Sequence, residues 1–204
     1  MITLYQIKPA FQRVLRPLVR QLAQGHISPN QVTLTALVLS GVTGLAIAAF
    51  PQSPTLLLAL PVIFAGRLAL NAIDGMLARE YDRATPLGAV LNELGDVVAD
   101  AALYLPFARI PGMPAPWIVV IVVLGIITEM AGILAWAMGQ SRSYAGPLGK
   151  SDRALVFGLI AVAIGLGLEP GAWLGGVWFG VVSLQVWTIF NRVQVILQEV
   201  SPCS

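Results

Sequence analysis

Long apolar segments alternate with short polar segments along most of this chain. Six apolar segments approach the roughly 20 residues that a helix needs to cross the hydrocarbon core of a bilayer. They lie at 33–50, 55–73, 87–108, 116–138, 154–168 and 172–190, and the fifth is short and rich in glycine. The pattern predicts an all-α polytopic membrane protein with six transmembrane helices at about 31–198, forming one domain over 1–204.

A different pattern precedes the first apolar segment. Between about residues 9 and 24, one face of a helix would carry Phe11, Val14, Leu15, Leu18 and Leu22, and the other Arg13, Arg16 and Arg20. This arrangement favours an amphipathic helix that lies in the membrane interface, with its basic face among anionic headgroups. Ser28 and Pro29 then predict the start of the first membrane helix, because serine caps helices and proline suits their first turn.

Composition agrees with a membrane protein. Hydrophobic residues make up 57% of the 204 residues and charged residues only 11%, and the mean hydropathy is +0.80. A soluble domain is more polar than this. The single cysteine, Cys203, excludes an intramolecular disulfide.

Basic residues are distributed unevenly between the two sides of the predicted spans. Only Arg109 falls on the outer side, Arg67 falls within the membrane, and the other side holds Lys8, Arg13, Arg16, Arg20, Arg79, Arg83, Arg142, Lys150, Arg153 and Arg192. The positive-inside rule therefore predicts an inner (plasma) membrane protein with both termini in the cytoplasm. No nucleic-acid partner is expected.

Polar residues form stripes on the second and third predicted spans. Arg67, Asn71, Asp74 and Ala78 are spaced so that they share one helical face about 60° wide. On the next span the residues Gly88, Asn92, Asp96 and Asp100 step by four, and Glu93 lies on the same edge. Charged stripes in a membrane face one another or a water-filled cavity, so Asp74 and Asp96 are expected to meet near the cytoplasmic ends.

Clustered oxygen ligands predict a site for a hard divalent cation, Mg²⁺ or Mn²⁺, with phosphate as its companion. A cation transporter is the rival interpretation, but a transport path would spread polar residues across the full membrane depth. Arg67 is expected to balance the acids or to contact a lipid phosphate. Glu129 is expected either to pair with Arg67, to line the cavity, or to serve structure alone.

The segment DGMLAREYDRATPLG, residues 74–88, carries an Asp-Gly, then Ala-Arg, then a glycine at fixed spacing. In this motif the chain resembles the CDP-alcohol phosphatidyltransferase family, as it does in its six-helix layout and N-terminal amphipathic helix. Two of the four aspartates of the family pattern are replaced, by Asn71 and Asn92. Each replacement keeps an oxygen ligand and removes one negative charge.

The resemblance implies roles for individual residues. Asp96 would take the proton of the acceptor alcohol, with Asp100 as the second candidate for the base. The metal would be held by Asn71, Asp74, Asn92, Asp96 and Glu93. The CDP group would contact Asp74, Gly75, Ala78, Arg79 and Gly88. An anionic acceptor or a lipid phosphate would contact Arg142, Lys150 and Arg153, which could equally be ordinary positive-inside charges.

The resemblance also implies an activity. A phosphatidyl group would move from CDP-diacylglycerol to a small alcohol, with release of CMP, in phospholipid synthesis. The alternatives are transfer from a CDP-alcohol to diacylglycerol, and a catalytically silent relative that binds CDP-lipid. A homodimer is expected from the family and from the small residues Gly165, Gly167, Gly175, Gly176 and Gly180, which equally suit packing within one subunit.

Overall fold

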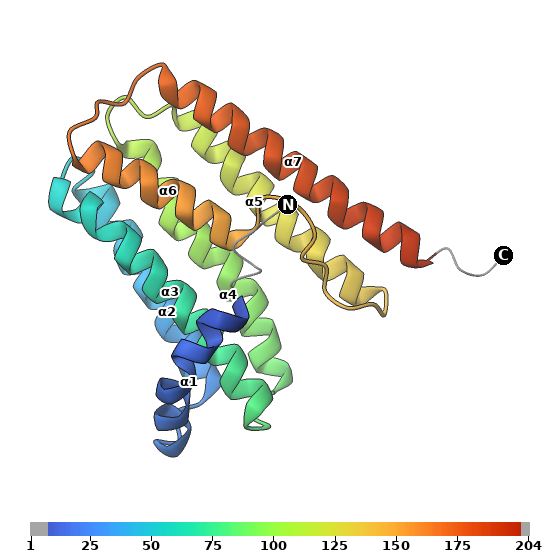
Figure 1. Cartoon of the computed structure of the whole chain (residues 1–204). Helices are drawn as coiled ribbons and strands as arrows, with labels where there is room; N and C mark the ends of the chain where they lie inside the picture. The colour runs from blue at the N-terminus through green and yellow to red at the C-terminus, as the bar shows by residue number, and fades with distance from the viewer. Residues whose placement is uncertain (1–7, 201–204) are drawn as a thin grey trace.

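The computed structural model describes residues 8–200, and in this part of the chain it contains helices and no strand. Figure 1 shows their arrangement. The helices are α1 (Lys8–Gln24), α2 (Pro29–Ala49), α3 (Pro54–Glu80), α4 (Pro86–Tyr104), the short 3₁₀ helix η2 (Leu105–Arg109), α5 (Ala115–Ala137), α6 (Lys150–Gly165) and α7 (Trp173–Val200). The all-α fold class is therefore confirmed.

Three helices begin with the same local device. Ser28, Ser53 and Thr85 each precede a proline, and each hydroxyl accepts a hydrogen bond from a backbone N–H of the first helical turn. The proline occupies a position where an N–H would have no helical partner, and the hydroxyl satisfies one N–H that would otherwise be orphaned. At Ser28 the side chain of Gln31 completes a capping box, so the predicted helix start is confirmed.

Helix ends differ from the apolar segments that predicted them. Helix α3 continues to Glu80 and α7 to Val200, beyond the predicted limits at 73 and 190, whereas α4 stops at Tyr104. An apolar segment marks the part of a helix that avoids water, but backbone hydrogen bonding continues through polar residues. Helix α4 ends early because Pro106 lacks the N–H that an α-helix requires.

Four helices are long and apolar enough to cross a membrane: α2, α3, α5 and α7. Helix α6 has only 16 residues, and α4 carries the three acids Glu93, Asp96 and Asp100. Six spans therefore remain a prediction, of which four are supported by length and hydropathy. Many large apolar side chains of these helices face outward, including Val38 (62% exposed), Val62 (75%) and Phe179 (65%), as expected of surfaces that face lipid.

The core lies between α2, α3, α4, η2, α5, α6 and α7. The ring of Tyr104 stacks on that of Phe157 with centroids 4.3 Å apart, and Phe157 in turn contacts Trp178 and Phe107. Helices α5 and α7 run side by side, and α6 packs on α3 (Figure 1). Helices α2 and α4 approach so closely that a Cβ atom on Gly44 would overlap the carbonyl group of Ala102.

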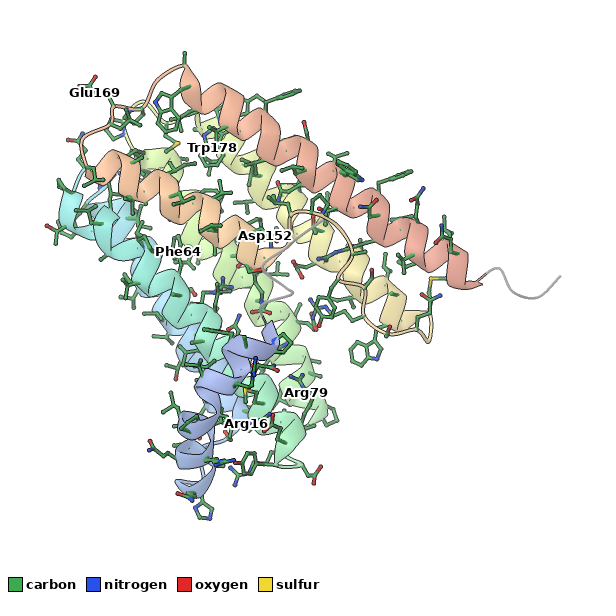
Figure 2. The ribbon with its side chains drawn as sticks, viewed as in Figure 1. Arg16, Phe64, Arg79, Asp152, Glu169 and Trp178 are labelled. Atoms are coloured by element: carbon green, nitrogen blue, oxygen red, sulfur yellow. The ribbon has the colours of Figure 1, made fainter. Side chains whose placement is uncertain are left out.

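Helix α1 packs against one end of α3. Val19 and Ala23 form a small buried cluster with Ile73, Met76 and Leu77. Figure 2 shows Arg16 and Arg79 at this end of the molecule, with Glu169 at the opposite end. Arg83, just beyond α3, donates to the carbonyl oxygens of Ala23 and Ile27, both at 3.1 Å. The amphipathic segment is thus attached to the bundle at the end where the polar stripes lie.

Candidate active site

A cavity of about 540 Å³ lies where α1, α2, α3 and α4 meet the segment before α6 and the ends of α5 and α7. The sequence predictions placed many site residues here, and the structure brings most of them to its wall. These are Asn71, Asp74, Gly75, Ala78, Arg79, Gly88, Asn92, Asp96, Arg142 and Lys150. Predicted site residues from α3, α4, the segment before α6 and α6 itself therefore share one cavity.

Two glycines leave room for polar groups on one half of the wall. A Cβ atom on Gly75 would lie 2.9 Å from a guanidinium nitrogen of Arg79, and one on Gly88 would lie 2.6 Å from Oδ1 of Asn30. Arg79 lies beside Gly75 and can contact phosphate, whereas Asn30 lies beside Gly88 and can form hydrogen bonds to a nucleotide. Arg79 forms no ion pair with any described residue, so its guanidinium is available for an anion.

Asp74 lies on the cavity wall but is only 4% exposed. Thr33 of α2 donates a 2.8 Å hydrogen bond to its Oδ2 atom. Within residues 8–200, no basic side chain pairs with Asp74. A buried carboxylate without a cation is costly, which makes this aspartate the natural place for a bound one.

Asp96 is held from two sides. Asn71 Nδ2 donates to its Oδ1 atom at 2.6 Å, and the ammonium group of Lys150 pairs with Oδ2. Arg67 donates to its backbone carbonyl oxygen at 3.3 Å. The aspartate on α4 is therefore fixed by the polar stripe of α3 and by the first residue of α6.

Three predicted site residues do not line this cavity: Glu93, Asp100 and Arg153. Asp100 pairs with Arg67 at 2.6 Å and with Arg153 at 2.7 Å, and Glu93 pairs with Arg142. Asp100 is one turn deeper than Asp96, where α6 covers it, and Glu93 is rotated by one residue step from Asn92. As the proton acceptor, Asp100 therefore has less structural support than Asp96.

Glu129 joins three arginines from different segments. Its carboxylate lies 2.9 Å from Arg142, 3.2 Å from Arg153 and 3.8 Å from Arg192, and it also lines the cavity. Of the alternatives raised by the sequence, Arg67 does balance acids, but these are Asp100 at 2.6 Å and Asp96 at 3.9 Å rather than Glu129. Glu129 instead holds Arg142, Arg153 and Arg192 together, and these arginines form the basic side of the site.

Arg142 belongs to the segment between α5 and α6, and its charge is secured by its neighbours. Burial lowers the pKa of its guanidinium, but the acidic groups of Glu93, Tyr144, Glu129 and Asp96 outweigh that effect and raise the pKa. The Tyr144 ring lies 5.3 Å from the guanidinium carbon. Arg142 is therefore a permanent cation held between two acids.

Arg192 is a site residue that sequence reasoning counted only as a positive-inside charge. It lines the cavity and donates to the carbonyl oxygens of Thr128 at 2.5 Å and Ala145 at 3.3 Å. Gln185, Thr188 and Arg192 are all buried. Their spacing of three and four residues on an apolar helix was the signal that could have identified this inward face.

The cavity wall contains oxygen ligands of the kind that a hard cation prefers. Asp74 and Asp96 offer carboxylate oxygens, and Asn71 and Asn92 offer amide oxygens. In the described part of the chain, no three acidic, histidine or cysteine side chains gather into a group able to hold a metal ion. Two carboxylates, one of them already paired with Lys150, provide charge for one divalent ion more readily than for two.

The family model described as CDP-alcohol phosphatidyltransferase matches residues 26–191. The chain belongs to this family. CDP-alcohol phosphatidyltransferases are enzymes, and the motif residues Asp74, Gly75, Ala78, Arg79 and Gly88 that first indicated this transferase family all lie on the cavity wall.

Relatives of this transferase include the inner membrane protein YnbA of Escherichia coli, which is 47% identical over 96% of this chain and 97% of its own length. The phosphatidylinositol phosphate synthase of Mycolicibacterium smegmatis is 26% identical over 93% and 86% of the two chains.

Among solved structures, the phosphatidylinositol phosphate synthase of Mycobacterium tuberculosis shares the fold. The form in complex with manganese and citrate has a TM-score of 0.70 at 20% identity, covering 89% of this chain and 88% of that one. The form with CDP-DAG bound has a TM-score of 0.67 at 21% identity, covering 89% and 91%. The membrane protein fold expected from the sequence is therefore shared with these enzymes.

Proposed function

We propose that this transferase moves a phosphatidyl group from CDP-diacylglycerol to a small alcohol and releases CMP. The single observation that carries the proposal is the shared cavity, whose wall contains the family motif on α3 and α4, Asp96, and the basic residues Arg142, Lys150 and Arg192. The relative whose structure contains CDP-DAG supports the choice of a CDP-activated lipid as the donor.

Different residues of the cavity wall would contact the CDP-lipid donor and the acceptor alcohol. Arg79, beside Gly75, is positioned to pair with the pyrophosphate, and Gly88 with Asn30 lines the same half of the cavity. Asp96 joins this half to the basic residues through its side-chain contacts. The acceptor oxygen would form a bond to the lipid-bearing phosphorus while the bond to the CMP oxygen breaks, and the hydroxyl proton would pass to Asp96.

Asp74, Asp96, Asn71 and Asn92 are the residues that would hold a divalent cation. Such an ion neutralises charge on phosphate oxygens and on the departing CMP. The family relative in complex with manganese supports a divalent cation here. Thr33 would orient Asp74 through its hydrogen bond, and Asn71 would orient Asp96.

The proposal includes six membrane spans with the cavity at the cytoplasmic face, supported by the basic residues at that end of the helices. Helix α1 would rest in the interface beside the cavity, where Phe11 and Gln12 contribute to its wall. A homodimer is also proposed. Gly175, Gly176 and Gly180 of α7 face open space and permit a close helix contact, whereas Gly165 packs on Leu57 and Leu58 of the same chain.

The test is CMP release by purified protein in detergent or lipid vesicles. Labelled CDP-diacylglycerol is incubated with single alcohols while Mg²⁺ and Mn²⁺ are varied or removed by chelation. We expect metal-dependent CMP release that falls by about 10²–10⁴-fold in Asp96→Asn, the range for loss of a general base, and strongly in Asp74→Asn. Glu80→Gln is the matched control, because Glu80 is an exposed acid on α3 that pairs only with Arg16 at 2.9 Å among the described residues.

Other outcomes identify the alternative functions. Full activity in both aspartate variants would refute the roles proposed for Asp74 and Asp96. Product formation from a CDP-alcohol and diacylglycerol, without turnover of CDP-diacylglycerol, would show that the headgroup phosphate is transferred to diacylglycerol. Binding of CDP-lipid without turnover would indicate a silent relative, and metal flux through vesicles would indicate a transporter.

A further inference from the structure

The basic half of the cavity is where the acceptor alcohol would bind. The proposed donor contacts Gly75, Arg79 and Gly88 belong to α3 and α4, and Asp96 joins this side to the basic side through its contacts with Asn71 of α3 and Lys150 of α6. Glu129, Arg142, Lys150 and Arg192 line the acceptor half. The charge state of this half therefore determines which class of alcohol fits.

Every cation in the acceptor half already contacts an acid. Arg142 pairs with Glu93 and with Glu129, and Lys150 pairs with Asp96. Arg192 lies 3.8 Å from the Glu129 carboxylate. Behind them, Arg153 pairs with Asp100 and Glu129. In this network of described residues, the four cations are paired with four carboxylates, those of Glu93, Asp96, Asp100 and Glu129, so none of these cations needs an anionic ligand for its charge to be compensated.

These pairs lie away from bulk water. The side chain of Glu129 is only 8% exposed and that of Arg192 only 3%. Glu129 projects from the interior of α5 and cannot swing away, because its carboxylate is fixed by three arginines from two other helices and a loop. Charges in such a setting are weakly screened by salt, and removing one partner leaves the other buried and unpaired.

A phosphate monoester needs cations that are free to approach its oxygens. Here the ester would have to displace Glu129, Glu93 or Asp96 from a cation and would then remain beside the displaced carboxylate. Like charges at such separations oppose binding strongly. The acceptor half also presents neutral hydrogen-bonding side chains to the cavity, from Asn92, Tyr144 and Ser151, which suit hydroxyl groups.

We infer that the acceptor is an alcohol without phosphate, such as a neutral polyol, and that Glu129 sets this preference by neutralising the arginines around it. The inference rests on the proposed function, since it concerns the acceptor of the same reaction. It also departs from the relatives named phosphatidylinositol phosphate synthase. Glu129 is thus a specificity-determining residue.

The first experiment compares matched acceptors with the wild-type protein. CMP release from CDP-diacylglycerol is measured with glycerol against glycerol 3-phosphate, and with inositol against inositol 1-phosphate. In each pair that supports CMP release, we expect the neutral member to react about tenfold faster or more, as like-charge opposition predicts. A phosphorylated member that reacts as fast as its neutral partner overturns the inference.

The second experiment changes the charge of Glu129 and keeps its shape. In Glu129→Gln, the ratio of phosphorylated to neutral acceptor turnover should rise by about tenfold, because the arginines regain free positive charge. Inorganic phosphate should also raise the unfolding temperature of this variant and leave that of the wild type unchanged. Glu80→Gln, which removes an exposed acid, should alter neither reading.

A third variant keeps the inference testable if Glu129→Gln fails to fold. Glu93→Gln removes the other acid from Arg142 and leaves the three-arginine cluster with its central carboxylate, so it should shift the same ratio in the same direction by a smaller factor. An unchanged ratio in both glutamine variants overturns the role of Glu129. Absence of CMP release with every alcohol refutes the proposed function itself, whereas release that favours phosphorylated acceptors refutes this inference alone.

Discussion

The amide of Asn71 donates a 2.6 Å hydrogen bond to the carboxylate of Asp96. Asn71 stands where the family pattern has its first aspartate, so a neutral donor contacts a carboxylate that would otherwise face a second one. Two adjacent carboxylates repel each other unless a cation lies between them. The substitution therefore lets the helices α3 and α4 come together in the absence of metal.

Asn71→Asp should make folding dependent on metal. Without a divalent cation, the new carboxylate repels Asp96 and the unfolding temperature should fall. With Mn²⁺ or Mg²⁺ it should recover, by about 2–4 °C for each kcal/mol of added binding free energy. Thermal unfolding in detergent, with chelator or with metal, measures both shifts. A metal response no larger than that of the wild type would contradict this account of Asn71.

Lys150→Met should strengthen metal binding. The ammonium group of Lys150 pairs with Oδ2 of Asp96 and so competes with a cation for that oxygen. We expect a lower Kd for Mn²⁺, measured by electron paramagnetic resonance of the free ion, even if turnover falls. Arg109→Met is the control, since Arg109 lies in η2, outside the described cavity wall. Weaker Mn²⁺ binding by Lys150→Met would show that the ammonium does not compete.

Arg153→Met should destabilise the protein severely. The arginine is 1% exposed and pairs with Asp100 and Glu129, so its loss leaves two buried acids with less compensation. Breaking a buried pair costs about 3–5 kcal/mol. Unfolding by denaturant in mixed micelles provides the measurement, and Arg109→Met, which removes an exposed arginine, should have little effect. Equal stability of the two variants would argue against a structural role for the network.

Gly44→Ala should destabilise the contact between α2 and α4. The added Cβ atom would overlap the carbonyl group of Ala102, and overpacking of this kind costs about 1–3 kcal/mol. Gly41→Ala, one turn earlier on the same helix, meets nothing within 4 Å and should be neutral or stabilising, because alanine favours helix over glycine by about 1 kcal/mol. The two unfolding temperatures should therefore move in opposite directions or differ clearly.

The single cysteine offers a test of topology. Cys203 lies outside the described residues, but a cytoplasmic C-terminus predicts that a membrane-impermeant maleimide labels it only after cells are permeabilised. In a Cys203→Ser background, Gln52→Cys lies in the exposed turn between α2 and α3 and should be labelled in intact cells. Labelling of Cys203 in intact cells would show that the C-terminus lies outside the cytoplasm and would contradict the predicted orientation.

Helix positions were largely predictable from the sequence because apolar segments and Ser-Pro or Thr-Pro starts are local signals. The motif Asp74 to Gly88 was equally local, and its residues do share a cavity. The ion-pair network was not predictable, since Glu129 meets Arg142, Arg153 and Arg192 from three other segments. Helical spacing alone placed Asp96 and Asp100 on one stripe, and only the packing of α6 separated their environments.

Helix α1 has two different surroundings. Phe11 and Gln12 lie on the cavity wall, while Val14 (77% exposed) and Leu18 (46%) are free to contact acyl chains. A change in headgroup charge or lipid packing that tilts this helix would therefore also reshape the cavity proposed as the active site. If the reaction takes place in this cavity, the composition of the surrounding bilayer would influence its rate through the position of α1.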